Sequence, residues 1–141
     1  MMTRIGKLAL KAMNVALLVM LATASAYAQR QYFCELKSTA NDFSYTKLDI
    51  VVDFGTADIF DGWGRLNADL KIVDACGEEI KFHSMVDASS YLSDHGWTFV
   101  QAYSSACNKR SFTNWIFTKQ ADTLEQAKAG IFTKADFKKR K

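Results

Sequence analysis

The sequence predicts a small α+β domain in which an antiparallel or mixed sheet of about five to six strands carries one well-defined helix. Three observations support this prediction. Short runs in which apolar and polar residues alternate, as in half-buried strands, follow one another between turn residues. One segment, residues 85–95, has apolar residues near helical spacing and capping residues at both ends. The chain has no proline and seven glycines, a composition typical of an ordered domain.

The first 28 residues have the pattern of a cleavable secretory signal peptide. Three basic residues come first, followed by the apolar run 15–24 and then by Ala26-Tyr27-Ala28, with small residues where a signal peptidase cuts. The alternative is a short N-terminal membrane anchor, but the apolar run is too short to span a bilayer. We therefore expect cleavage before Gln29, export to the periplasm or the cell exterior, and no stable membrane insertion or lipid anchor afterwards.

Several segments of the remaining chain have the composition of strands. They span residues 31–37, 45–54, 66–74, 79–82, 97–103 and 112–119. In the second of them, Leu48, Ile50 and Val52 alternate with mainly polar neighbours, which predicts one buried and one solvated face. Residues 38–42 supply the first turn, and residues 104–111 supply a polar loop that lets the last two strands pair as antiparallel neighbours.

The helix over residues 85–95 has the clearest local signals. Ser84 is a good N-cap, and Asp87 three residues later completes a start similar to a capping box. Gly96 follows the last turn, where a left-handed residue commonly ends a helix. The capping residues therefore fix both ends of this helix.

A second, weaker helix begins at Asp122 and continues to about residue 129. A basic tail follows it and includes Lys138, Lys139 and Arg140. We therefore expect a single α+β domain over residues 29–119, with a C-terminal helix and basic tail over residues 120–141.

The block from residue 81 to residue 103 carries a helix that opens with F-x-S-M-x-D-A and a strand that reads G-W-x-F-V. The strand is expected to place Trp97, Phe99 and Tyr103 on one face, so that helix and strand close one core. This block resembles small uncharacterised exported proteins of Gram-negative gut bacteria, although the two serines at residues 89–90 depart from their pattern. The resemblance implies a compact α+β fold with a mixed or antiparallel sheet. It implies no particular activity, cofactor or catalytic residue.

The charge balance argues against a nucleic-acid-binding protein. The whole chain has 18 Lys and Arg against 15 Asp and Glu, but its first 28 residues contain three of the basic residues and none of the acidic ones. The remaining chain is therefore close to neutral, with its basic excess in the last eight residues. The tail residues Lys138, Lys139 and Arg140 form either a solvated chain end or a surface for anionic groups.

Three cysteines follow the signal peptide: Cys34, Cys76 and Cys107. Cys76 lies in the sequence Cys76-Gly77-Glu78, which is typical of the turn of a hairpin. In an oxidising compartment, one disulfide and one free thiol are expected, and three pairings are open.

The best candidate for binding is the glycine-flanked loop of residues 58–64, which contains Phe60 and Trp63. An aromatic side chain on such a loop can stack on a sugar ring or on the surface of a partner protein. Alternatively, these side chains fold back and cover one end of the sheet. We favour a non-enzymatic binding or interaction module with an unknown protein or carbohydrate partner.

The alternative is a small exported hydrolase or thiol-dependent enzyme in which Cys107 is the nucleophile and His95, next to Asp94, is the base. No C-x-x-C pair or glycine-rich nucleophile turn marks such a site, and a histidine at a helix C-terminus has a simpler electrostatic explanation. The spacing of His83, His95 and the cysteines matches no zinc site, and we expect no metal and no cofactor.

Overall fold

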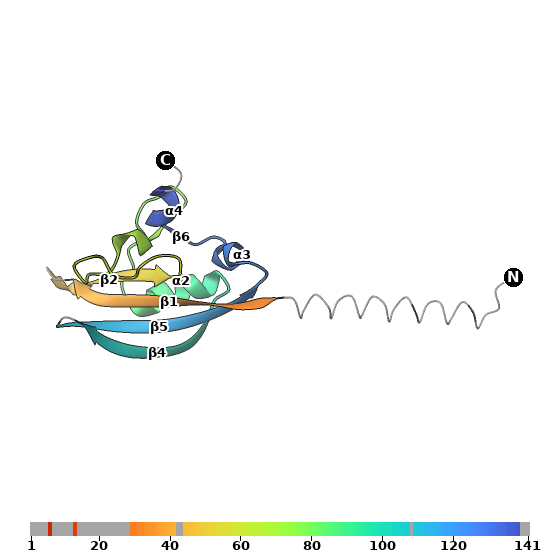
Figure 1. Ribbon diagram of the computed structural model, residues 1–141, viewed down its shortest axis with the longest axis horizontal. Coiled ribbons are helices and arrows are strands. Elements are labelled where there is room, and N and C mark those ends of the chain that lie inside the picture. The colour runs from red at the N-terminus through yellow and green to blue at the C-terminus, as the bar shows by residue number, and fades with distance from the viewer. Residues whose placement is uncertain (1–5, 7–12, 14–28, 42–43, 108, 139–141) are drawn as a thin grey trace. The chain divides into compact units, whose positions relative to one another are not determined.

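The computed structural model describes residues 29–41, 44–107 and 109–138, together with Gly6 and Met13 (Figure 1). Residues 1–30 form one unit and residues 31–141 a second, compact one. The predicted signal peptide and its cleavage site therefore fall outside the described residues, apart from Gly6 and Met13.

Within the described part of the chain, no helix is both long enough and apolar enough to cross a membrane.

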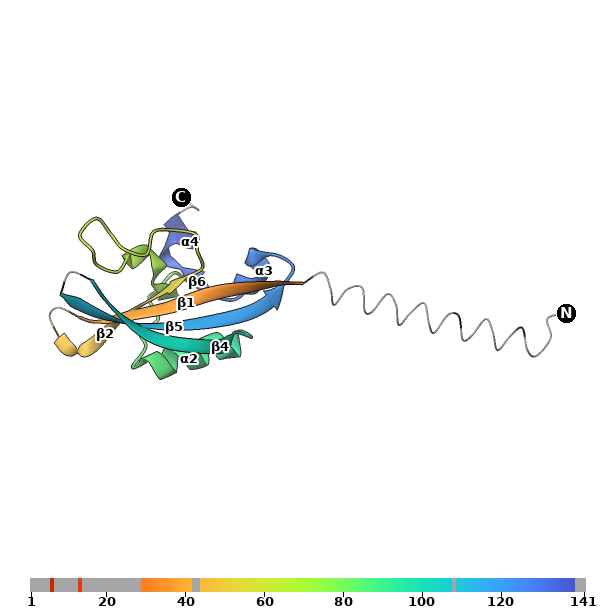
Figure 2. The same cartoon turned by 60° about the horizontal axis from the view of Figure 1, so that its bottom comes forward.

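The main element is a four-stranded sheet in the order β2-β1-β5-β4. Its strands are β1 (Arg30–Asn41), β2 (Ser44–Asp53), β4 (Thr98–Cys107) and β5 (Arg110–Ala121). Strand pairs β1–β2 and β4–β5 are antiparallel. Between the central strands, Thr118 Oγ1 donates to the Tyr32 carbonyl and Thr39 Oγ1 donates to the Ser111 carbonyl, so β1 and β5 also run in opposite directions. Strands β2 and β4 are the two outer strands (Figures 1 and 2).

A smaller antiparallel sheet and several short helices complete the domain. These elements are η1 (Ala68–Leu70), β3 (Ile72–Val73), α2 (Met85–Asp94), α3 (Leu124–Lys128), β6 (Phe132–Thr133) and α4 (Lys134–Lys138), and β3 pairs with β6. The predicted α+β class is confirmed. The strands form a four-stranded and a two-stranded sheet instead of one sheet of five or six strands.

Helix α2 spans the predicted segment to within one residue. The Ser84 hydroxyl accepts a hydrogen bond from the Asp87 backbone N–H at 3.2 Å, and Gly96 adopts φ +82° directly after the helix. The helix buries Met85, Ala88 and Leu92 in a core that includes Leu36, Val52 and Phe117 of the sheet. The burial of this one face explains the amphipathic pattern of the segment.

Three of the expected loops and strands are wrong. Residues 79–82 are not a strand, because only Glu79 forms a bridge, with Val73. Residues 104–111 are not a loop, because β4 continues to Cys107 and β5 begins at Arg110, with Lys109 at φ +64° in the turn between them. Residues 66–74 are not one strand. The Asn67 side chain accepts a hydrogen bond from the Asp69 N–H at 3.0 Å and caps a short 3₁₀ helix, so the strand that follows contains only Ile72–Val73.

A β-bulge changes which side chains of β4 share a face. Phe99 lies opposite Phe117, but Gln101 lies opposite Ile116, so Val100 is the extra residue. Phe99 therefore packs its ring against Phe117 on the α2 face, whereas the hydroxyl of Tyr103 reaches Glu35 on the other face. The expectation that Trp97, Phe99 and Tyr103 share one face is wrong because it assumed an unbroken two-residue period.

The C-terminal segment packs into the same core as the rest of the domain. Ala127 and Ile131 belong to the buried cluster that also contains α2, and β6 pairs with β3. Thr123 caps α3, because its hydroxyl accepts a hydrogen bond from the Gln126 N–H at 3.2 Å. The N-cap is therefore Thr123 and not Asp122, and the helix begins at Leu124, one residue later than a cap at Asp122 would give.

Candidate functional site

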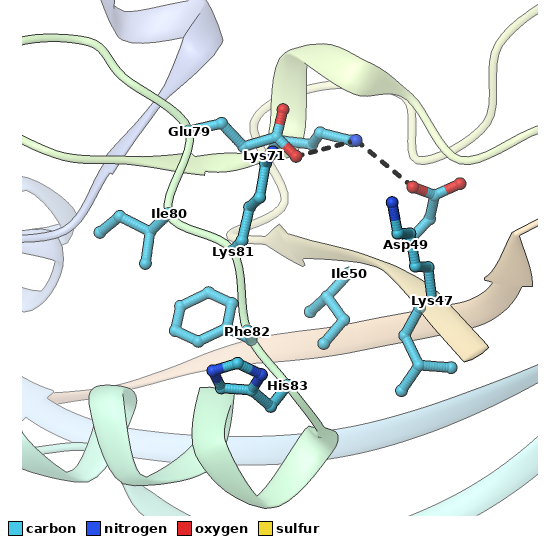
Figure 3. Close-up of a pocket in the computed structure, with 10 residues that line it drawn as sticks. Lys47, Asp49, Ile50, Lys71, Glu79, Ile80, Lys81, Phe82 and His83 are labelled. Atoms are coloured by element: carbon cyan, nitrogen blue, oxygen red, sulfur yellow. Dashed lines mark hydrogen bonds and ion pairs between the residues drawn. The ribbon is translucent and has the colours of Figure 1, made fainter. Parts of the chain in front are cut away.

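A groove of about 390 Å³ lies beside β2, one of the two outer strands of the sheet (Figure 3). It is lined by residues 47–50 of β2, by Lys71 and by residues 79–83, which link the β3 hairpin to α2. Cavities of this size are typical of small-molecule sites. The groove brings together three stretches of chain that are far apart in the sequence.

A row of ion pairs crosses one end of the groove. Lys71 Nζ lies 3.3 Å from Asp49 Oδ1 and 3.0 Å from Glu79 Oε1, and Lys134 Nζ lies 2.6 Å from Glu79 Oε2. The small sheet positions these groups, because the Lys134 backbone N–H donates to the Lys71 carbonyl at 3.1 Å. Figure 3 shows the Lys71 ammonium between the two carboxylates, at the opposite end of the groove from Phe82 and His83.

The ion pairs shift the pKa values of their members. Partial burial alone would lower the pKa of Lys71, but the hydrogen bond to Glu79 and the two nearby carboxylates outweigh burial and raise this pKa. Partial burial would also raise the pKa of Glu79, but the hydrogen bonds from Lys134 and Lys71 hold this pKa below its usual value. Both groups are therefore charged at neutral pH.

The other walls of the groove combine apolar side chains with two further lysines. Ile50 is buried in the core, and Phe82 packs edge-on against Tyr91 of α2 with ring centroids 5.5 Å apart. Lys47 and Lys81 are exposed, and neither has an ion-pair partner among the described residues. The arrangement can hold an anionic group near the lysines and an apolar body over the isoleucine and phenylalanine side chains.

The lowered pKa of Glu79 makes part of the folding stability depend on pH. Because the pKa is lower in the folded chain, the stabilisation is present above the unfolded-state pKa of about 4.3 and is lost as the pH falls through the folded-state pKa. We expect Glu79→Gln to cost about 0.5–1 kcal/mol near pH 7, since the pair is partly exposed, and to cost little near pH 3. Urea denaturation at the two pH values measures this difference.

Glu78→Gln is the matched control for that measurement. Glu78 is exposed and makes no ion pair to another described residue. Its replacement should leave the pH dependence of stability unchanged. Equal effects of the two substitutions would show that the ion pairs of Glu79 do not stabilise the fold.

The candidate binding loop splits its two aromatic residues. Phe60 turns inward and packs edge-on against Phe112, with ring centroids 5.3 Å apart, so it covers one end of the sheet. Trp63 is 83% exposed. Asp61 fixes the loop between them, because its Oδ1 accepts hydrogen bonds of 2.9 Å from the N–H groups of Trp63 and Arg65. Trp63 is thus presented to solvent on an ordered turn, apart from the groove.

The basic tail is only partly described. Lys138 is exposed and pairs with Asp69, with 2.6 Å between Nζ and Oδ1. Lys139 and Arg140 lie outside the described residues.

The structure does not form the disulfide that was expected. All three described cysteines, Cys34, Cys76 and Cys107, are free thiols. Cys34 points into the core from β1, and burial raises the pKa of its thiol. Cys76 and Cys107 are exposed.

The proposed Cys107 and His95 pair is not brought together. His95 ends α2, where its Nδ1 lies 2.7 Å from the Tyr91 carbonyl oxygen, and Cys107 is at the far end of β4. Ten strand residues separate these ends by about 30 Å. Among the residues that the structure describes, no group of three or more His, Cys, Asp or Glu side chains could hold a metal ion.

Sequence reasoning missed the groove residues. The local pattern places these residues in predicted strands or a turn, and no local spacing connects Lys47, Lys71, Glu79 and Lys81. The single available signal is the clustering of charge at residues 78–81 beside two strongly apolar positions.

In comparisons with models of protein families, with curated proteins and with solved structures, we found no match to this chain. The resemblance to exported proteins of gut bacteria stays a prediction.

Proposed function

We propose that this chain is an exported, non-enzymatic binding protein whose groove beside β2 takes a small anionic molecule with an apolar body. The observation that carries the proposal is the composition of the groove, where Lys47 and Lys81 have no described ion-pair partner and lie beside the apolar side chains of Ile50, Ile80 and Phe82. We propose export because residues 1–28 have the pattern of a signal peptide. The form of the protein that binds the ligand would then begin at Gln29.

The charge of the groove favours an anion. Lys71 is already neutralised by Asp49 and Glu79, and Glu79 is shared with Lys134. The positive charges of Lys47 and Lys81 therefore remain for a ligand. A carboxylate or sulfonate placed near both ammonium groups gains charge-assisted hydrogen bonds, and an apolar body gains burial in the same cavity.

Fluorescence titration with two dyes of similar shape tests the proposal. Anilinonaphthalene sulfonate is anionic, and N-phenylnaphthylamine is its uncharged counterpart. We expect the exported protein, whose intact mass should match a chain that begins at Gln29, to bind the anionic dye more tightly. We expect the double substitution Lys47→Gln and Lys81→Gln to weaken binding of the anionic dye at least about tenfold and to change binding of the neutral dye little.

Two further variants serve as controls. Lys109→Gln removes the same charge from the exposed turn between β4 and β5 and should leave dye binding unchanged. Trp63→Ala removes the exposed aromatic side chain of the loop and should also leave it unchanged. Loss of binding in Trp63→Ala would assign the site to the loop, and equal binding in all variants would show that the groove is not a site for anions.

A further inference from the structure

Strand β4 is an outer strand of the main sheet, and its outer edge has no strand partner within the described part of the chain. Nine of its ten residues are exposed, which leaves both faces of the strand open as well as its edge. Such an edge presents unpaired backbone N–H and C=O groups to any extended chain that can approach it.

The side chains of β4 do little to prevent pairing. Its sequence, TFVQAYSSAC, contains no charged residue and no proline. The opposite outer strand, β2, carries Lys47, Asp49 and Asp53, and the groove segment runs beside it. Soluble proteins usually protect an exposed edge with charges, with proline or with bulges, and on β4 the one such device is the bulge at Val100.

Exposed apolar side chains lie on both faces of β4, next to its open edge. Phe99 and Val100 are each 48% exposed, and Tyr103 is 43% exposed. Because of the bulge, Phe99 lies on the α2 face and Tyr103 on the opposite face. A strand added to β4 would therefore cover apolar surface on both sides of the enlarged sheet.

We propose that β4 pairs with β4 of a second copy of this chain, antiparallel and about a two-fold axis, to form one continuous eight-stranded sheet. Such pairing sets the regular run Gln101–Cys107 of one copy against the same run of the other, so no like charges face each other.

The charges at the two ends of β4 favour antiparallel pairing with a second copy of this chain. Exposed Asp94 precedes the start of the strand and exposed Lys109 follows its end. In an antiparallel pair, the start of one β4 lies at the end of the other, so Asp94 of one copy and Lys109 of the second come to the same end of the interface, twice over. A parallel arrangement would instead place like charges together.

Sedimentation velocity over a range of protein concentrations tests this interface. We expect the purified protein to be a dimer at about 100 μM. Ser104 is an exposed residue at the centre of the paired run, and Ser104→Lys should weaken the dimer at least about tenfold by placing like charges opposite each other at the two-fold axis. Val86→Lys adds the same charge at a 64% exposed position on α2 and should leave the dimer intact.

A charge reversal tests the orientation of the two strands. Asp94→Lys should weaken the dimer several-fold, and adding Lys109→Glu should restore it. Circular dichroism would establish that each variant is folded. A monomer at about 100 μM, or equal weakening by Ser104→Lys and Val86→Lys, would overturn the proposal. Failure of the charge reversal to restore the dimer would overturn the antiparallel arrangement.

Discussion

Replacing Phe117 with alanine is expected to lower the free energy of unfolding by about 3–5 kcal/mol. Phe117 lies on the central strand β5 with no exposed surface and belongs to the buried cluster beneath α2. Its removal loses the transfer free energy of the ring and leaves a cavity that the rigid sheet cannot close. Urea denaturation followed by circular dichroism measures the change.

Phe99→Ala is the matched control for this prediction. Phe99 lies directly opposite Phe117, with ring centroids 5.8 Å apart, but it is 48% exposed. The same chemical change there should cost only about 1–2 kcal/mol, because less surface leaves water on folding. Equal costs at the two positions would contradict the placement of Phe117 in the buried core and of Phe99 at its exposed margin.

The second large effect concerns Lys37, a lysine buried on the face of the sheet opposite α2. Its ammonium donates to Asn114 Oδ1 and lies 3.2 Å from Glu35 Oε1. It also lies 5.8 Å from the ring centroid of Phe60 and 5.9 Å from that of Phe112. Asn114 has no exposed surface. Each polar group here is buried at a cost that only its partner offsets.

We expect Asn114→Leu to cost about 3–4 kcal/mol, because it takes a hydrogen-bond partner from a buried charge. Lys37→Met should cost about 2–3 kcal/mol, because it leaves the buried Asn114 oxygen without its donor. The double substitution should be more stable than the sum of these costs predicts, since an apolar pair then leaves neither the Lys37 ammonium nor the Asn114 oxygen buried without the other.

Urea denaturation of the four proteins gives this coupling energy directly. Additive costs would mean that Lys37 and Asn114 do not depend on each other. Lys109→Met is a control for removal of a lysine, because Lys109 is exposed in a turn and its replacement should change stability by no more than about 0.5 kcal/mol.

The parts of the fold that were predicted correctly are those specified by local residues. Ser84, Asp87 and Gly96 fix α2 through hydrogen bonds and a backbone conformation within one short stretch of chain. Strands with one buried face also show in the sequence, as in the run that contains Ile50 and Val52. These features need no knowledge of the rest of the molecule.

The errors occur where tertiary structure overrides the local pattern. The second half of β4 is polar and exposed on both faces, so it lacks the alternation that identifies a half-buried strand. Val51 points to the opposite face of the sheet from Ile50 and Val52. It is nevertheless fully buried, because both faces of the sheet are covered at this point. Lys37 is polar and buried for the same reason.

The groove could not be predicted for a different reason. Its walls come from residues 47–50, 71 and 79–83, which meet only because the β3 hairpin returns past β2. The loop of residues 58–64 had a recognisable local signal, and the structure still divides it, with Phe60 turned inward and Trp63 outward. Local composition identified a candidate loop but could not assign orientation to its side chains.

The pairing of β3 with β6 has a consequence for the order in which the chain can fold during synthesis. Ile72 and Ile131 belong to the same buried core, and the strand that contains Ile72 pairs with Phe132 and Thr133. The small sheet, this part of the core and the ion pair between Lys134 and Glu79 therefore cannot form before residues 131–134 have been synthesised. Until then β3 lacks its partner strand and the core lacks Ile131, so a chain that ends before residue 131 cannot complete the packing of this domain.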